Sequence, residues 1–305
     1  MDISFIITPW NCKDLLKATI DSVKASKTKY EYEVIVYDHG STDGSIEMLE
    51  QEYPEVTLFK GGDVGFAAAN NEGLKVSKGR YTVLLNADTK MSEDTIETMV
   101  SFMDSRPDIG VATGKLVLAV SGKLDPACRR SFPTPWVSFA RFSGLAKLFP
   151  KSKTFNRYNL EYLSEDDEYE IDSCSGAFQM SRREVLNKIG LLDDTFYMYG
   201  EDIDWCYRAK QAGWKVYYYP KTVILHYKGY LSGKSAKKKR HNPRPIWEFH
   251  RARVLFYDKH YKNKYLRTFR FIIKLGIWLR YLVVSRLQLH PDANFNDNPN
   301  PYANK

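Results

Sequence analysis

An acidic side chain directly after a buried strand is the first place in this chain where chemistry is expected. Asp88 follows the apolar run Tyr81–Leu85, and the amide of Asn86 stands two residues before it. The run predicts a strand buried on both faces, as in the middle of a mostly parallel sheet, where ligands bind outside the carboxyl ends of the strands. A carboxylate at that position is suited to hold a divalent cation or a sugar hydroxyl. Taken alone, Asp88 also fits the start of a helix.

A second acidic group, Glu201, Asp202 and Asp204, opens a predicted helix that runs to Gly213. A helix N-terminus tolerates this negative charge because the helix dipole is positive there. Three- and four-residue spacing places Glu201, Asp204 and Arg208 on one face, while Asp202 points elsewhere. From spacing alone, ordinary first-turn helix charges and a catalytic carboxylate pair are equally good interpretations.

The elements that must position these residues alternate regularly in the first half of the chain. The pattern predicts strands, each followed by a helix, at Ile3–Thr8, Tyr32–Tyr37, Val56–Phe59 and Tyr81–Leu85. This order indicates βαβ units and an α/β fold with a parallel sheet flanked by helices. The loops at 38–45, 61–65 and 86–89 would then open on one sheet edge. Neither a dinucleotide-binding fingerprint nor a P-loop is present, which removes two common uses of such a sheet.

The second half is less regular. Residues 110–170 show little pattern apart from a strand-like run at Gly114–Val117, and Ile171–Met180 is strand-like as a whole. Further strands are predicted at Trp214–Tyr219 and Val223–His226. On its own, a histidine after an apolar strand, such as His226, is most often a structural residue.

Composition limits the setting in which the protein works. The chain has 305 residues, is 43% hydrophobic and contains four widely spaced cysteines with no CxxC pair, so a packed globular protein in a reducing cytosol is expected. Its first residues form a strand and lack the features of a signal peptide. Residues 231–305 contain 17 Lys and Arg and four acidic residues, a net charge of +13, whereas residues 1–230 sum to −5. Such asymmetry suggests an anionic partner for the basic part.

The basic part contains three stretches. The loop 234–240 is formally a nuclear address, and an ordinary solvated loop is the simplest interpretation, but its position after His226 also suggests that it folds over the site and binds a diphosphate. A helix is predicted at 245–265, and the almost wholly apolar Phe271–Val284 contains Lys274 and Arg280. These two charges outweigh the apolar residues for membrane insertion, so an interfacial helix is expected, with a helix packed on the protein or on a second subunit as the alternative. The tail 289–305 is predicted to be disordered.

Several motifs in the correct order resemble family 2 glycosyltransferases with the GT-A fold, and in particular the bacterial branch of rhamnosyltransferases. The resemblance covers about residues 3–230. It is found at Asp38–Ser45, Gly65–Gly73, Leu84–Thr89, Cys174–Ala177, Phe196–Ala209, Gly213-Trp214 and His226.

The resemblance implies inverting transfer of a sugar from a nucleoside-diphosphate donor, with a catalytic domain at 1–230. Its donor half would be about 1–115 and its acceptor half 116–230, followed by a basic, membrane-facing part at 231–288. It implies that Asp202 is the catalytic base, that Asp88 and His226 hold Mg²⁺ or Mn²⁺, and that the acceptor is bound by Glu201, Asp204 and Arg208. The implied donor-binding residues are Pro9, Asn11, Asp38, Phe66, Asn70, Asn86 and Gly176.

The branch further implies a dTDP- or UDP-linked sugar, rhamnose being the first choice, and a lipid-diphosphate-linked acceptor. The enzyme would be peripheral on the inner face of the cell membrane, in cell-envelope glycan synthesis, with a homodimer as an open option and no nucleic acid partner. Two other functions remain. A sugar-nucleotide pyrophosphorylase is disfavoured because its glycine-rich N-terminal loop is missing. An inactive glycan-binding module gains some support from Asn86, where the family's metal motif usually has an acid.

Overall fold

The first half of the sheet is parallel, as the alternation of strands and helices predicts. The computed structural model describes residues 1–228 and 244–287. Within them, the order β3-β2-β1-β4 is entirely parallel. Every residue of the central strands β1 and β4 is buried, which explains their continuous apolar sequence. The elements of this half are β1 (Ile3–Ile7), α1 (Lys13–Lys24), β2 (Tyr32–Asp38), α2 (Ser45–Glu52), β3 (Thr57–Lys60), α3 (Phe66–Val76) and β4 (Tyr81–Leu85).

The second half of the sheet is mixed. The full order is β3-β2-β1-β4-β8-β6-β9-β5, with β7 paired to β9. Here β8 runs antiparallel to both β4 and β6, and β9 runs parallel to β6 but antiparallel to β5 and β7. The added strands are β5 (Thr89–Met91), β6 (Ile109–Leu118), β7 (Tyr169–Ile171), β8 (Phe178–Arg182) and β9 (Lys215–His226).

Two sequence predictions change in this half, and one strand is present that was not predicted. The run predicted as one strand at 171–180 is two strands, because the Cys174–Ala177 segment leaves the sheet between them. The two strands predicted at 214–219 and 223–226 are one strand, β9, and its pairing with β6 contains register shifts. The short strand β5 was not predicted, since three residues are too few to show a period.

Five helices follow β5 in the described residues up to 228: α4 (Thr95–Ser105), α5 (Pro135–Phe142), α6 (Leu145–Leu148), α7 (Arg183–Ile189) and α8 (Glu201–Gln211). Helices α5 and α6 lie in the segment for which the sequence predicted little structure. The side chain of Thr134 caps α5 by accepting from the backbone N–H of Val137, and Pro135 occupies the first turn.

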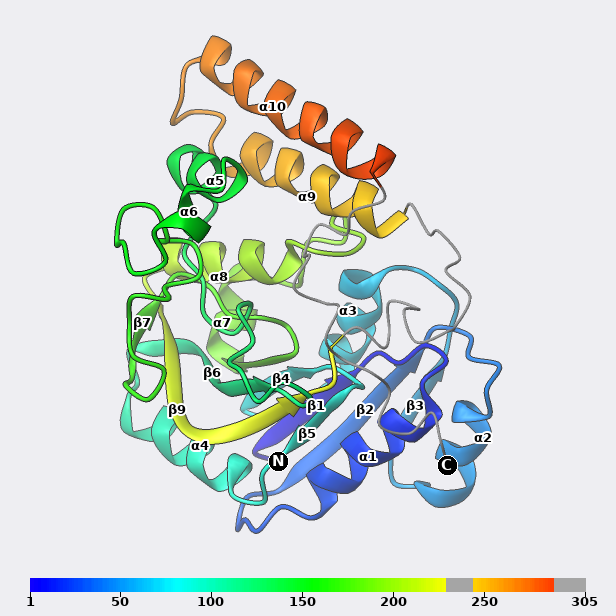
Figure 1. Ribbon diagram of the computed structural model, residues 1–305. Helices are drawn as coiled ribbons and strands as arrows, with labels where there is room; N and C mark the ends of the chain where they lie inside the picture. The colour runs from blue at the N-terminus through cyan, green and yellow to red at the C-terminus, as the bar shows by residue number, and fades with distance from the viewer. Residues whose placement is uncertain (229–243, 288–305) are drawn as a thin grey trace.

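The last two helices, α9 (Arg244–His260) and α10 (Arg267–Arg286), form an antiparallel pair beyond α8 (Figure 1). Helix α9 joins a second hydrophobic cluster in which Phe256 packs with Phe196 and Tyr207 of the preceding chain. Helix α10 is outermost and packs mainly on α9, where Lys274 contacts Asp258 at 2.8 Å. In the described ranges, none of the helices has the length and apolar character needed to cross a bilayer. The predicted basic loop at 234–240 and the tail at 289–305 lie outside the described residues.

Candidate active site

The carboxyl ends of the parallel strands place the predicted donor-binding loops side by side. The loops after β1 and β2 are tied together, since Asn11 Oδ1 accepts from the N–H of Thr42 at 2.7 Å and the N–H of His39 donates to the carbonyl of Pro9 at 3.1 Å. Asp38 is fully buried; one of its oxygens accepts from the N–H groups of Gly40 and Ser41. Its Oδ2 has no partner. A buried carboxylate oxygen without a partner at this edge is suited to accept a hydrogen bond from a ligand.

The other predicted donor-side residues lie around the start of α3. The N–H of Phe66 donates to the carbonyl of Tyr197 at 2.8 Å, and a Cβ on Gly176 would stand 3.3 Å from the Phe66 ring. Asn70 is buried and its amide donates to the carbonyl of Phe66 at 2.8 Å, so that side chain is held within its own helix. The N–H of Asn86 donates to the carbonyl of Ala177 at 3.1 Å. Their roles in donor binding stay predictions.

Asp88 meets His226 because of the unpredicted strand β5. The antiparallel pairing of β5 with β9 sets Thr89 opposite His226, and the N–H of Tyr227 donates to the carbonyl of Asp88 at 2.8 Å. Asp88 Oδ1 lies 3.3 Å from His226 Nε2 and forms no hydrogen bond, although the side chain is buried. Asp88 and His226, the two residues predicted to hold a cation, therefore face each other, and Asp88 Oδ1 is free of hydrogen bonds from the described residues.

A third carboxylate, Asp125, fixes the orientation of His226. Asp125 is completely buried and lies 2.7 Å from His226 Nδ1, while its other oxygen accepts from Lys228 Nζ at 2.8 Å. Burial favours the neutral imidazole, but Asp88 and Asp125 together raise the pKa of His226 to about 9. Burial would raise the pKa of Asp125, and Lys228 and His226 reverse this and lower it. With Nδ1–H donated to Asp125, Nε2 is directed at Asp88.

The carboxylate of Asp202 is paired with an arginine that the sequence analysis missed. Arg130 Nη2 donates to Asp202 Oδ2 at 2.7 Å and to the carbonyl of Cys174 at 2.6 Å. The N–H of Gly176 also approaches Asp202 Oδ2, at 3.4 Å. Burial opposes the charge on Arg130, but Asp202 raises its pKa. Because Leu85 of β4 pairs with Phe178 of β8, the 174–177 segment brings Asp202 to the same sheet edge as Asp88.

Glu201 differs from Asp202 in that its Oε2 has no hydrogen-bond partner among the described residues. Its side chain is buried and Oε2 makes no hydrogen bond. Burial, and next the charge of Asp202, raise the pKa of Glu201 to about 8. The charge of Asp202 is thus neutralised by Arg130, whereas the adjacent carboxyl group of Glu201 favours its protonated form.

Asp204 and Arg208 make contacts within the protein. Asp204 is fully buried and accepts from Arg208 Nε at 2.8 Å, His260 Nε2 at 2.6 Å and Lys259 Nζ at 2.7 Å. Arg208 also donates to the carbonyls of Ile189 and Leu191. Burial would raise the pKa of Asp204, but the hydrogen bond from His260 and the charges of Arg208 and Lys259 lower it to about 2. The contacts connect α8 to α9, and the acceptor-binding role predicted for both residues stays a prediction.

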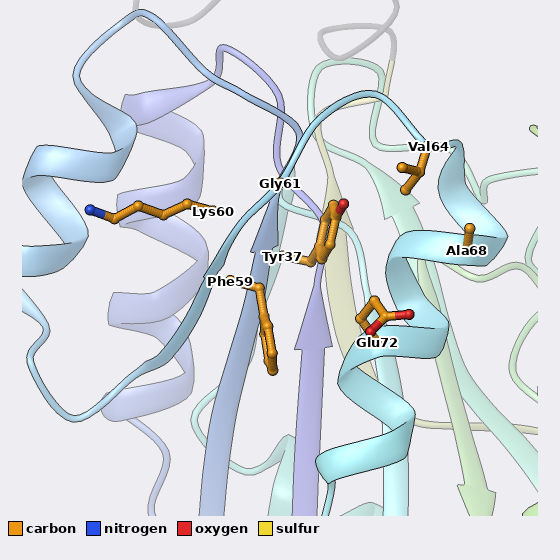
Figure 2. Close-up of a pocket in the computed structure, with 7 residues that line it drawn as sticks. All are labelled: Tyr37, Phe59, Lys60, Gly61, Val64, Ala68 and Glu72. Atoms are coloured by element: carbon orange, nitrogen blue, oxygen red, sulfur yellow. The ribbon is translucent and has the colours of Figure 1, made fainter.

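A separate hollow of about 320 Å³ lies at the β2–β3 end of the sheet, against α3 (Figure 2). Side chains alternate along a strand, so Tyr37 lines this hollow while Asp38 points to the opposite face. None of the predicted catalytic or metal-binding residues lines it. The lining residues are Tyr37, Phe59, Lys60, Gly61, Val64, Ala68 and Glu72.

Comparison with known families identifies the family of this chain. Residues 4–190 match the model described as Glycosyl transferase family 2. The chain belongs to this family. It is therefore a glycosyltransferase, as the motifs predict.

Two similar relatives of this glycosyltransferase are named for rhamnose transfer. The N-acetylglucosaminyl-diphospho-decaprenol L-rhamnosyltransferase of Mycobacterium tuberculosis (strain ATCC 25618 / H37Rv) is 26% identical over 219 residues, which is 68% of this chain and 70% of the relative. The rhamnosyltransferase WbbL of Escherichia coli (strain K12) is 25% identical over 235 residues, covering 74% of this chain and 83% of the relative. The predicted resemblance to the rhamnosyltransferase-like branch is confirmed at this level.

Solved structures confirm the predicted GT-A fold of this glycosyltransferase. The mannosyltransferase PcManGT from Pyrobaculum calidifontis, in complex with GDP-Man and Mn²⁺, matches with a TM-score of 0.54 at 18% identity, over 94% of this chain and 73% of that one. S. aureus TarS 1-349 matches with a TM-score of 0.54 at 14% identity and the same two coverages.

Proposed function

We propose that this family 2 enzyme transfers a deoxyhexose such as rhamnose, with inversion, from a dTDP- or UDP-linked donor to a hydroxyl of a lipid-diphosphate-linked glycan. The observation that supports it most is the placement of two unlike acidic sites at the same edge of the sheet, through the pairing of β4 with β8. One site is Asp88 with His226, where Asp88 Oδ1 makes no hydrogen bond. The other is Asp202 with Arg130, beside Glu201, whose raised pKa favours the protonated carboxyl group.

Asp202 acts as the general base in this mechanism. Arg130 and the N–H of Gly176 hold its carboxylate in one orientation. The carboxylate accepts the proton of the acceptor hydroxyl as the oxygen attacks the anomeric carbon from the face opposite the leaving group. Such a base contributes about 10²–10⁴-fold to the rate. Attack from that face inverts the anomeric centre.

Glu201 binds the acceptor rather than taking its proton. With its pKa raised to about 8, it remains protonated at neutral pH and is able to donate a hydrogen bond from its carboxyl group. Its buried Oε2 has no hydrogen-bond partner among the described residues, and we expect a sugar hydroxyl to supply one. Asp202 and Glu201 thereby divide proton acceptance and acceptor orientation between them.

The residues present fit a divalent cation at Asp88. Its buried Oδ1 lacks a hydrogen bond, and His226 Nε2 stands 3.3 Å away. Among residues 1–228 and 244–287, no group of three or more His, Cys, Asp and Glu side chains is arranged to hold a metal. Two protein ligands suit Mg²⁺ or Mn²⁺, since such ions commonly complete their coordination with substrate phosphates and water. A bound cation would neutralise charge on the diphosphate leaving group.

The donor and acceptor classes follow from the named activities of the relatives. One relative is named for rhamnose transfer to N-acetylglucosaminyl-diphospho-decaprenol, and an E. coli relative for glucose transfer from UDP-Glc to a diphosphoundecaprenol-linked sugar. Because these acceptors have a lipid chain, we place this enzyme on the inner face of the cell membrane, in cell-envelope glycan synthesis.

The proposal is tested by incubating the full chain with dTDP-rhamnose or UDP-sugars, an N-acetylglucosaminyl-diphospholipid, and Mg²⁺ or Mn²⁺. We expect a cation-dependent product whose new linkage has the inverted anomeric configuration by NMR. Asp202→Asn should bind the donor in a thermal-shift assay yet form almost no product. Donor binding without turnover by the wild-type chain on any of these acceptors would instead favour the inactive glycan-binding module. A retained configuration would overturn the mechanism.

A further inference from the structure

Helix α10 presents an apolar face that residues 1–228 and 244–287 leave exposed. Only Ile277 and Val284 of this helix are buried, and both belong to the face toward α9. On the other side Phe271 is 65%, Ile272 62% and Val283 55% exposed. We call this face the α10 stripe. It consists of the exposed side chains Phe271, Ile272, Leu275, Leu279, Leu282 and Val283.

The spacing of the α10 stripe makes it one continuous surface. Ile272, Leu275, Leu279 and Leu282 follow each other at three- and four-residue intervals, which places them in a row along one side of the helix. Isolated exposed apolar residues are ordinary on protein surfaces, but a contiguous row with polar edges marks an interaction surface. In Figure 1, α10 lies on the far side of α9 from the sheet, so the row is at the outer end of the molecule.

The charge of α10 identifies the kind of partner. The helix has five cationic residues and no acidic residue. Arg267 and Arg286 are exposed at its two ends, while Lys274 contacts Asp258 of α9. An apolar face with an exposed arginine at each end suits the boundary between acyl chains and anionic headgroups of a bilayer. A second copy of the chain docked symmetrically on the same face would bring the exposed arginines of both copies onto one apolar surface.

We propose that the α10 stripe lies in the interface of an anionic bilayer and fixes the orientation of the active site above it. The proposal deepens the proposed function, because it rests on an acceptor whose lipid chain is held in the membrane. It also specifies which face of this enzyme touches the lipid, with the row of apolar side chains among the acyl chains and the terminal arginines among the headgroups.

Helix α9 links α10 to α8, the helix that contains Asp202. Helix α9 carries α10 on one side and contacts α8 on the other, where Lys259 and His260 bind the buried Asp204 at 2.7 and 2.6 Å. Phe256 packs with Tyr207 of α8 at a ring separation of 5.5 Å. Because Asp202 is in the same helix as Asp204, a bilayer docked on α10 would be held at a fixed distance from the catalytic carboxylate.

The experiment compares the full wild-type chain with Ile272→Ser/Leu275→Ser/Leu279→Ser. Vesicles of phosphatidylglycerol or of phosphatidylcholine, both free of acceptor, are floated through a density gradient. We expect the wild type to float with phosphatidylglycerol and stay behind with phosphatidylcholine, and the triple variant to lose at least about 10-fold of its vesicle-bound fraction. The matched control Val76→Ser/Val120→Ser removes exposed apolar residues from other elements and should float like the wild type.

Circular dichroism and the melting temperature should show the triple variant folded, since it changes exposed residues only. A wild-type chain that does not bind anionic vesicles, or a triple variant that binds them as well, would overturn the proposal. A wild type that elutes as a dimer and a triple variant that elutes as a monomer, with no flotation by either, would show that a second copy covers the stripe.

Activity then separates this proposal from the proposed function. The triple variant should lose at least about 10-fold with a long-chain acceptor embedded in vesicles, yet match the wild type with a short-chain, water-soluble acceptor. Equal loss on both acceptors would overturn the link between docking and catalysis. If the wild type is inactive on both acceptors but floats, the proposed function fails while the docking surface stands.

Discussion

The two acidic sites at the edge of the sheet differ in how the protein treats their charge. At Asp88 the carboxylate keeps one buried oxygen without a hydrogen bond and faces the Nε2 of His226. At Asp202 the carboxylate is bound by Arg130 and by backbone N–H groups. A buried charge is costly unless it is paired. Asp202 thus has hydrogen-bonded partners within the chain, whereas the charge of Asp88 is met by the His226 imidazole, whose pKa it helps to raise.

The largest effect should come from removing the base. Asp202→Asn keeps the shape of the side chain but removes its ability to accept the proton, so kcat should fall about 10²–10⁴-fold. Donor binding involves the other site, so the dissociation constant of the donor should change by less than about 3-fold. Steady-state kinetics and donor titration of the same preparation measure both. A fall in donor affinity equal to the fall in kcat would contradict the division between the two sites.

The second effect concerns stability. Arg130→Gln leaves the Asp202 carboxylate buried without its cation, and breaking a buried ion pair from one side costs about 3–5 kcal/mol of unfolding free energy. Urea denaturation followed by circular dichroism measures this loss. Arg157→Gln, which changes an exposed arginine, is the control and should change the free energy by less than about 0.5 kcal/mol. A similarly small change in Arg130→Gln would mean that Asp202 does not depend on the pair.

A smaller effect, on metal affinity, is expected for Asp125, which orients His226 and is not itself predicted to bind the cation. Asp125→Asn weakens the acceptor for Nδ1–H of His226, and loss of such a supporting hydrogen bond costs about 10–100-fold in metal affinity. Mn²⁺ binding in the presence of dTDP or UDP, followed by electron paramagnetic resonance, measures the affinity without turnover. Asp166→Asn, a change of an exposed aspartate, should bind Mn²⁺ like the wild type. Equal affinities for Asp125→Asn and the wild type would remove the positioning role.

A further prediction concerns the pH dependence of stability. Glu201 has a folded-state pKa raised from 4.5 to about 8, so the folded protein holds a proton there that the unfolded chain releases above pH 4.5. This group therefore makes the unfolding free energy fall as pH rises from about 4.5 to about 8. Glu201→Gln removes the titration, and its stability should fall less steeply over that range in urea denaturation at several pH values. Parallel curves for the two proteins would contradict a neutral Glu201.

Local pattern accounts for the parallel half of the fold and for most of the candidate site. The apolar runs of β1 and β4 and the alternation of strands with helices were sufficient to predict β1 to β4 and α1 to α3. The antiparallel insertion of β8 between β4 and β6 was not predictable, because pairing direction depends on how distant segments meet. Helices α5 and α6 were missed because they are short and their segment has no sustained period.

The sequence by itself determined the chemical candidates Asp88, Asp202 and His226, since their motifs are local and occur in a fixed order, and it determined the amphipathic character of α10. The tertiary structure decided which partners these residues have. Arg130 meets Asp202 across 72 positions and Asp125 meets His226 across 101, through chain segments that have no motif of their own. The physical reason is that a buried charge selects its partner by proximity in the folded core, and proximity between distant segments follows from strand pairing rather than from local pattern.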